Sequence, residues 1–283
     1  MARTVAIGIQ SFADIREGNY FYIDKTSFIK EWWESGDSVT LIARPRRFGK
    51  TLNMSMLEQF FSIEYAGRKD LFENLFIWQD EKYHQLQGTW PVISLSFARV
   101  KENNFCSARN KICEILRNLY VKFRFLEKSN VLADSDRTFY KKMMSLEIED
   151  DVVTSALYQL SDYLCRYYGK KVIILLDEYD TPMQEAYVGG YWEELVGFIR
   201  GIFNSAFKTN PFLARGLMTG ITRVSKESIF SDLNHLKVIT TTSNKYADAF
   251  GFTEDEVFAA LEECGLEEKK GEGEEMVRWL YFW

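Results

Sequence analysis

Short apolar runs and helical stripes alternate along the chain, and their order predicts a mostly parallel sheet. Strands are indicated at residues 38–43, 91–97, 172–176, 212–220 and 236–241. Helices are indicated, by apolar residues recurring at helical spacing, at residues 26–33, 52–63, 104–125, 152–168 and 191–207. Because strands alternate with helices, we expect an α/β fold whose sheet is covered by helices on both faces.

The same pattern predicts how the chain is organised. Residues 1–245 are expected to form one domain, with residues 1–37 packing on it. Residues 128–150 are polar and lack a clear period, which indicates an insertion or a loosely packed excursion. Thr253 and Glu256 form a capping-box pattern that opens a further helix. Residues 246–283 are therefore expected to be an incomplete helical lid or a C-terminal tail.

The clearest chemistry follows the strand at 38–43, in residues 43–51 (Ala-Arg-Pro-Arg-Arg-Phe-Gly-Lys-Thr). A strand that leads into Gly49-Lys50-Thr51 and a helix is the layout of a phosphate-binding loop. In such a loop, backbone amides and a lysine hold the phosphates of a nucleotide while a hydroxyl reaches Mg²⁺. The usual pattern, G-x-x-x-x-G-K-[ST], has glycine where this chain has Arg44.

We expect the nucleotide to be bound by consecutive residues of this loop and of the first helical turn. They are Arg46, Arg47, Phe48, Gly49, Lys50, Thr51 and Leu52. The basic side chains of the loop are explained either by phosphates or by acidic groups packed beside it. A basic turn unrelated to phosphate would be the alternative, so a second motif is needed.

That second motif is the apolar run 172–176, which ends in Asp177 and Glu178. An aspartate at this point holds the Mg²⁺ shell in nucleotide-hydrolysing enzymes with such a loop, and a neighbouring acid orients the attacking water. We therefore assign Thr51 and Asp177 to the metal, and Glu178 and Lys50 to catalysis. Asp180 is followed by Thr181-Pro182, which indicates a turn, so Asp180 is interpreted as a loop or capping acid.

A third segment, Thr219-Gly-Ile-Thr-Arg223, follows a later strand. In a parallel sheet it lies at the same carboxyl edge as the phosphate loop, where open α/β sheets bind ligands. Thr219 or Thr222 is a candidate sensor of the γ-phosphate, and Arg223 a candidate for stabilising charge in the transition state. The alternative is a strand end followed by an ordinary turn and a surface arginine.

These residues carry a family resemblance. Residues 44–51 resemble the variant phosphate loop of the bacterial AAA-ATPase-like family, in which the first glycine is usually lost. Residues 12–26, 219–225 and 250–257 resemble its opening segment, its sensor segment and its entry into a helical lid. The resemblance implies a P-loop NTPase domain, a three-layer sandwich with a mostly parallel central sheet and the start of a helical lid. Members of this family often carry a PD-(D/E)XK nuclease-like domain downstream.

Residues 22–26, Tyr-Ile-Asp-Lys-Thr, allow two interpretations. The resemblance suggests that they lie near the base or the phosphate loop. Their own pattern indicates a helix N-terminus, with Asp24 or Thr26 as the cap and Tyr22 in the core. We prefer the second interpretation. No N-K-x-D guanine-reading motif is present, so we expect ATP rather than GTP.

Composition narrows the choice of protein class. None of the apolar runs approaches the ~18 residues that a membrane-spanning helix needs, so no membrane association is expected. Four cysteines without C-x-x-C spacing and two histidines argue against a zinc or catalytic-cysteine site and favour a cytoplasmic location. The net charge of −6 argues against direct nucleic-acid binding by this chain alone. The basic residues between Arg109 and Lys128 are interpreted as a solvated helix face.

We therefore expect a P-loop ATPase that binds ATP with Mg²⁺ and hydrolyses it as a switch or remodelling module. Two alternatives stay open: a non-hydrolysing ATP-binding scaffold for a protein partner, and the ATPase part of a nuclease or defence-type system whose nuclease domain acts in trans. Glu267-Glu-Lys-Lys270 contains E-x-K but lacks a flanking apolar strand, so it is interpreted as a solvated tail. The chain ends where the family's lid would continue, which suggests a truncated or shortened copy. The sequence does not indicate an oligomeric state.

Overall fold

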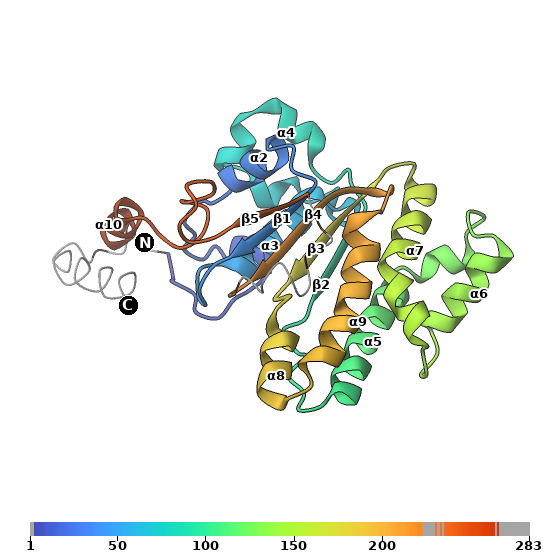
Figure 1. The fold of residues 1–283 in the computed structure, drawn as a ribbon. Helices are drawn as coiled ribbons and strands as arrows, with labels where there is room; N and C mark the ends of the chain where they lie inside the picture. The colour runs from blue at the N-terminus through green and yellow to red at the C-terminus, as the bar shows by residue number, and fades with distance from the viewer. Residues whose placement is uncertain (1–2, 223–229, 231–232, 234, 264, 266–283) are drawn as a thin grey trace.

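The central feature of the fold is a parallel sheet with the strand order β2-β3-β4-β1-β5 (Figure 1). The computed structural model describes residues 3–222, 230, 233, 235–263 and 265. The strands of this sheet are β1 (Val39–Ala43), β2 (Val92–Ser96), β3 (Val172–Asp177), β4 (Leu213–Gly220) and β5 (Leu236–Ile239). Every neighbouring pair is parallel, so all carboxyl ends lie at one edge.

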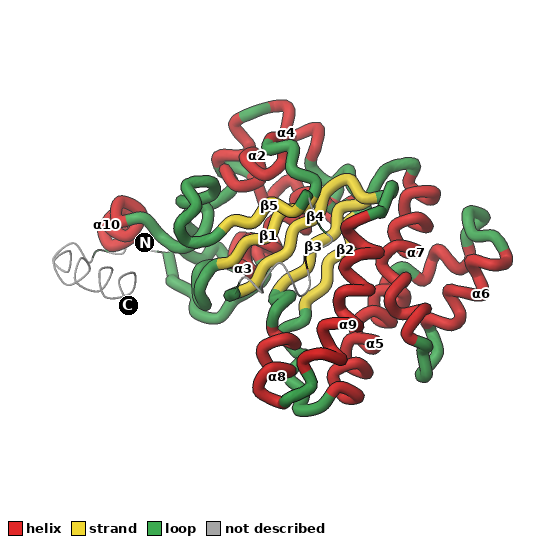
Figure 2. The backbone as a smooth tube through the Cα atoms, viewed as in Figure 1, coloured by secondary structure: helices red, strands yellow, loops and turns green. Residues whose placement is uncertain are grey.

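Helices cover both faces of the sheet (Figure 2). One side carries α1 (Phe12–Glu17), α2 (Ser27–Glu34), α3 (Lys50–Phe61) and α4 (Glu81–Leu86). The other side carries α5 (Phe105–Lys122), α6 (Asp134–Met143), α7 (Asp150–Tyr168) and α9 (Trp192–Phe203). The remaining helices are α8 (Thr181–Gly189), which follows β3 directly, and α10 (Glu254–Glu263), which lies beside the described N-terminal residues.

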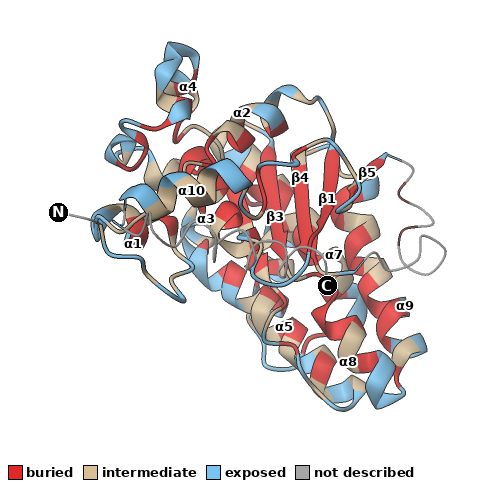
Figure 3. Ribbon diagram, turned by 90° about the vertical axis from the view of Figure 1, so that its left-hand side faces the viewer, coloured by how far each residue is buried: buried red, intermediate tan, exposed pale blue. Residues whose placement is uncertain are grey.

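The central strands are buried on both faces, which explains their nearly continuous apolar sequence (Figure 3). In β3, Ile174 and Leu176 belong to the core under α5, α7 and α9, whereas Ile173 and Leu175 belong to the core under α3. Side chains alternate across a strand, so one five-residue apolar run serves two hydrophobic cores. The expected α/β three-layer sandwich is confirmed.

Each predicted strand and helix has a counterpart whose bounds differ by a few residues at most. The sequence pattern missed α8, because Thr181-Pro182 was interpreted as a turn after β3. Pro182 instead occupies the first turn of this helix, where its missing amide hydrogen would have no acceptor inside the helix.

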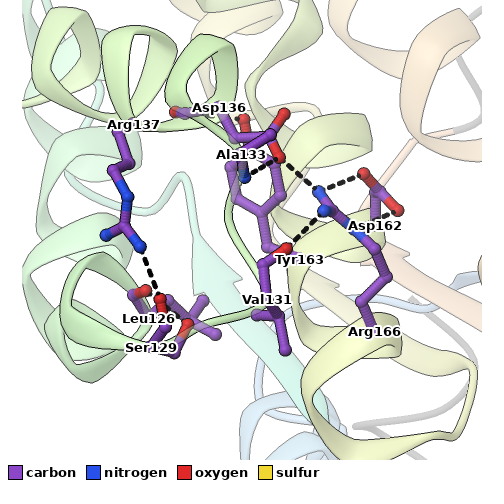
Figure 4. A network of polar contacts seen from close by, with 9 residues as sticks. All are labelled: Leu126, Ser129, Val131, Ala133, Asp136, Arg137, Asp162, Tyr163 and Arg166. Carbon is purple, nitrogen blue, oxygen red and sulfur yellow. Dashed lines mark hydrogen bonds and ion pairs between the residues drawn. The ribbon is translucent and has the colours of Figure 1, made fainter.

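The polar segment 128–150 contains the helix α6, although its sequence shows no clear period. Only a narrow stripe of α6 is apolar, and its Tyr140 and Met143 are fully buried against α5 and α7. Polar contacts supply much of the remaining attachment (Figure 4). Arg166 of α7 bonds Asp162 on its own helix and Asp136 of α6, at 2.7 and 2.9 Å.

Arg166 also donates to the backbone carbonyl of Val131 at 2.5 Å, just before α6. We expect Arg166→Ala to lower the free energy of unfolding by about 1 to 2 kcal/mol, because three acceptors lose a charged donor at a partly exposed site. Urea unfolding measures this loss. Arg124→Ala is the control, since Arg124 is exposed and lies 3.6 Å from Glu127. An equal loss in both variants would contradict the role given to Arg166.

Candidate functional site

The loop between β1 and α3 has the backbone of an anion cradle. Gly49 adopts φ +75°, in the left-handed region, and α3 begins at the next residue. Nothing lies within 4 Å of where its Cβ would stand, so glycine is favoured there by backbone conformation and not by lack of space. Arg47 is also left-handed, at φ +68°. The first amides of α3 have no acceptor inside the helix and, with the helix dipole, favour an anion at this end.

Lys50 lies under this loop, where its side chain is only 7% exposed. Its ammonium donates to the backbone carbonyls of Arg44 at 2.9 Å and Pro45 at 2.7 Å. Burial lowers the pKa of Lys50, and the carboxylates of Asp177 and Glu178 oppose this shift. The lysine therefore brings a positive charge into a sparsely hydrated position at the loop, close to two acids.

The phosphate loop and the acid-bearing strand meet at Asp177. The hydroxyl of Thr51, in the first turn of α3, donates to Asp177 Oδ2 at 2.7 Å. The hydroxyl of Thr219, at the end of β4, donates to Asp177 Oδ1. The register pairs Ile42 of β1 with Thr219 of β4, which places Thr219 between the loop and the acid. Three separate sequence motifs therefore converge on one carboxylate.

Glu178 follows Asp177 in a constrained turn. Its backbone is left-handed, with φ +49°, and its amide donates to Asp177 Oδ1 at 3.0 Å. Its side-chain Oε2 accepts a hydrogen bond from the hydroxyl of Thr181 at 3.0 Å. Thr51, Asp177 and Glu178 line one cavity of about 530 Å³, beside β2 and α5, and most of its lining residues are of polar types. Both acids can therefore be reached by a ligand from that cavity.

Arg44, at the position of the usual first glycine, has a structural role of its own. The side chain is 3% exposed and its guanidinium donates to the carbonyls of Thr240 and, at 3.5 Å, of Tyr246. Burial lowers the pKa of Arg44. Its amide donates to Gly220 at the end of β4, at 3.1 Å. Arg44 thus ties the phosphate loop to the segment that follows β5, whereas Arg46 and Arg47 are exposed.

A second cavity, of about 460 Å³, is lined in part by the loop residues 47–49. Gly49 and Leu52 line it together with apolar residues from both ends of the chain. These are Val5, Ala6, Ile9, Phe21, Tyr22, Ile23, Phe252, Val257, Ala260 and Leu261. Most of these residues were not predicted to form a site. The sequence signal that could have indicated this cavity is the apolar stretch Val5–Ile9. Val5 and Ile7 of this stretch are exposed in the structure.

Residues 22–26 lead into α2, as the preferred interpretation expects. Thr26 occupies the N-cap position but its side chain makes no cap hydrogen bond, and Asp24 accepts the amide of Thr26 at 2.8 Å. Tyr22 and Ile23 line the apolar cavity. The ammonium of Lys25 bonds the carbonyl of Asp248 and the carboxylate of Glu256, each at 2.6 Å, and so ties this segment to α10. The capping box between Thr253 and Glu256 is present, as predicted.

Two candidate segments are not placed. Arg223 lies outside the described residues, and so do residues 267–270 with the E-x-K pattern. Among the described residues there is no group of three or more His, Cys, Asp or Glu side chains that could hold a metal ion by themselves. The described part of the chain also contains no helix with the length and apolarity needed to cross a bilayer.

Comparison with known proteins agrees with this geometry. A family model described as "Predicted AAA-ATPase" matches residues 6–230. The chain belongs to this family. The family resemblance expected from the phosphate loop is therefore confirmed.

The chain is also similar to a curated protein from Azotobacter chroococcum mcd 1, described as "Uncharacterized protein in vnfD 5'region". The two are 28% identical over 264 residues, which are 92% of this chain and 45% of the relative. The chain thus spans less than half the length of that relative. No solved structure matches the chain.

The role of Arg44 in this AAA-ATPase family member can be tested by restoring the usual glycine. We expect Arg44→Gly to lower the free energy of unfolding by about 2 to 4 kcal/mol, because one buried and one partly buried carbonyl lose their donor and a cavity opens. Thermal or urea unfolding measures the change. Arg46→Gly is the matched control in the same exposed loop, with an expected loss below about 1 kcal/mol. A more stable Arg44→Gly protein would contradict the structural role of Arg44.

Proposed function

We propose that this chain binds Mg-ATP at the phosphate loop and hydrolyses it. The observation that carries the proposal is the 2.7 Å contact between Thr51 Oγ1 and Asp177 Oδ2. It brings the helix N-terminus that would hold the phosphates next to the acid that would hold the metal. Residues 126 positions apart in sequence meet there.

The donor set fits Mg²⁺. A threonine hydroxyl and a carboxylate are hard oxygen ligands, which this ion prefers. Mg²⁺ is commonly bound by one or two protein groups, with phosphate oxygens and waters completing its octahedron. Thr51 and Asp177 would hold the ion directly or through water. When bound, the ion would supply positive charge to the phosphates.

The residues around Thr51 and Asp177 would have the remaining roles in binding and hydrolysis. Lys50 and the amides around Gly49 neutralise phosphate oxygens. Glu178, whose Oε2 accepts a hydrogen bond from the Thr181 hydroxyl, would orient the attacking water. Thr219, hydrogen-bonded to Asp177, would sense the γ-phosphate through that carboxylate. Water adds to the γ-phosphorus while the bond to the bridging oxygen breaks, giving ADP and phosphate. Placement and electrostatics supply most of the acceleration.

The apolar cavity beside Gly49 is the best candidate for the base. Its volume, about 460 Å³, is within the range of small-molecule sites. Its lining comes from residues 5–25, from the loop and from residues 249–261. A purine there would touch the loop helix and the α10 segment at once, so nucleotide exchange would change the contacts of α10.

The same arrangement supports a switch or remodelling role. The chain just before α10 is tied to the loop by the amide of Gly251, which donates to the carbonyl of Phe48 at 3.2 Å. It is tied to α3 by Asn53 Nδ2, which donates to the carbonyl of Ala249 at 2.7 Å. The lid after Phe250 would move with the nucleotide state. A protein partner or a nuclease domain in trans stays a prediction, as does the cytoplasmic location.

Hydrolysis is tested by Glu178→Gln, which keeps the size of the side chain and removes its charge. We expect phosphate release to fall by about 10² or more while ATP affinity stays within about threefold, because Glu178 acts on water and not on the bound phosphates. Glu185→Gln on α8 is the control with the same charge change. Equal turnover in wild type and Glu178→Gln would refute the assignment. Tight ATP binding without any phosphate release would favour the scaffold alternative.

Binding is tested by calorimetric titration of wild type and Lys50→Ala with ATP, GTP and ADP in the presence of Mg²⁺. We expect ATP to bind wild type more tightly than GTP, and Lys50→Ala to lose at least about tenfold in ATP affinity, since a buried cation at the phosphates is removed. Lys142→Ala on α6, far from the loop, is the control. Unchanged ATP affinity in Lys50→Ala would refute the phosphate site.

A further inference from the structure

Asp180 lies in the turn between β3 and α8 and has none of the roles assigned above. It is 1% exposed and occupies the N-cap position of α8. An aspartate there ordinarily accepts a hydrogen bond from the amides of its own helix. Asp180 makes no such cap bond, and its carboxylate turns towards the end of β4. Its buried charge is therefore used for another contact.

That contact joins two turns at the carboxyl edge of the sheet. Asp180 Oδ2 accepts from the amides of Ile221 and Thr222, at 3.0 and 2.7 Å. It also accepts from the hydroxyl of Thr222 at 2.7 Å and from Gln184 of α8 at 3.0 Å. A buried carboxylate with several donors is a strong and geometrically specific link. One oxygen atom thus connects the turn after β3, the turn after β4 and the first turns of α8.

Tyr179 makes a parallel connection. Its amide donates to the carbonyl of Thr219 at 3.0 Å, and its hydroxyl donates to the carbonyl of Thr222 at 2.8 Å. The approach is close enough to exclude a side chain at Gly220. A Cβ there would lie 2.6 Å from Asp180 Oδ1 and 2.6 Å from a ring carbon of Tyr179. The two turns are therefore packed together as well as hydrogen-bonded.

Glu178 lies between two residues of this turn, Asp177 and Asp180, whose side chains are both held by hydrogen bonds. Asp177 before it is held by Thr51 and Thr219, and Asp180 after it is held by Ile221 and Thr222. The left-handed backbone of Glu178 is unfavourable for a residue with a side chain. Such a conformation persists only when its surroundings determine it, and it is common at functional sites.

We propose that Asp180 is a positioning residue, whose buried carboxylate holds the β3–α8 turn against the end of β4 and thereby fixes Glu178 in its left-handed conformation. This inference rests on the proposed ATPase function. Among the described residues, Lys50, Thr51 and Asp177 make no hydrogen bond to Asp180, although the Asp180 carboxylate joins Asp177 and Glu178 in opposing the lowered pKa of Lys50. Loss of Asp180 therefore displaces Glu178 and lowers turnover, while the hydrogen bonds of Lys50, Thr51 and Asp177 stay in place.

The kinetic test compares Asp180→Ala, Asp180→Asn and wild type. We expect Asp180→Ala to lower kcat by about 10² with ATP affinity within about threefold, because misplacement of a catalytic group by 1 Å has an effect of this size. Asp180→Asn, which keeps the shape and one oxygen acceptor, should recover at least about tenfold of the loss. Arg166→Ala is the control for reduced stability alone, with unchanged kcat. An unchanged kcat in Asp180→Ala, or affinity falling in parallel with kcat, overturns the proposal.

Thr222→Val tests the same contact while Asp180 itself is kept. Thr222 is exposed, and the substitution removes only the hydroxyl that donates to Asp180. We expect a several-fold fall in kcat, and a smaller fall when the change is made in Asp180→Asn, since both act on one contact. Equal effects in both backgrounds overturn the proposal, even where Asp180→Ala does not fold.

A double-mutant cycle of Glu178 and Asp180 can be measured on stability, without ATP hydrolysis. It therefore separates this inference from the proposed function. Glu178→Gly removes the conflict between side chain and left-handed backbone, so it should raise the midpoint of urea unfolding more in wild type than in Asp180→Asn. Equal shifts in the two backgrounds show that Asp180 does not constrain Glu178 and overturn the inference. A wild type that releases no phosphate refutes the ATPase function, while this cycle still decides the role of Asp180.

Discussion

The buried carboxylate of Asp177 is the contact on which the rest of the site depends. It is 5% exposed, and both of its oxygens accept hydrogen bonds. Thr51 reaches it from the helix after β1, Thr219 from the end of β4, and the amide of Glu178 from its own turn. A buried acid without such partners would be strongly destabilising. The fold and the proposed chemistry therefore use the same three donors.

Two cavities with different linings lie at the phosphate loop and its helix. One is lined by Thr51, Asp177 and Glu178 among mostly polar residue types, and the other, which is apolar, is lined by Gly49 and Leu52. A nucleotide has the same division, with a charged phosphate end and a flat aromatic base. The loop also receives structural support that a glycine could not give, because the guanidinium of Arg44 holds it to the chain after β5.

The sequence predicted the parts of the fold that depend on local pattern. Strands buried on both faces are nearly all apolar, and Gly49-Lys50-Thr51 needs a strand before it and a helix after it. The sequence pattern did not predict which of these elements are neighbours in space. Nothing in the pattern places β4 between β1 and β3, since strand order is set by tertiary packing. The apolar cavity was missed for the same reason, because its lining joins Ile9 to Phe252 across most of the chain.

Two residues show why local interpretation failed at the site itself. Asp180 occupies the N-cap position of a helix, in keeping with its interpretation as a loop or capping acid, yet its partners outside that helix are 41 and 42 residues further on. Arg44 departs from the phosphate-loop pattern, and the partners that explain it are nearly 200 residues away. In both cases the side chain is buried and hydrogen-bonded to distant groups, which a single sequence does not reveal.

The most direct test of the central claim is a crystal structure of the protein with Mn²⁺ in place of Mg²⁺ and a non-hydrolysable ATP analogue, with the metal located by its anomalous scattering. The account predicts the metal beside Thr51 and Asp177, with the β- and γ-phosphates at the amides around Gly49. A metal or triphosphate bound elsewhere, with Thr51 and Asp177 still hydrogen-bonded to each other and not in contact with the metal, would contradict it.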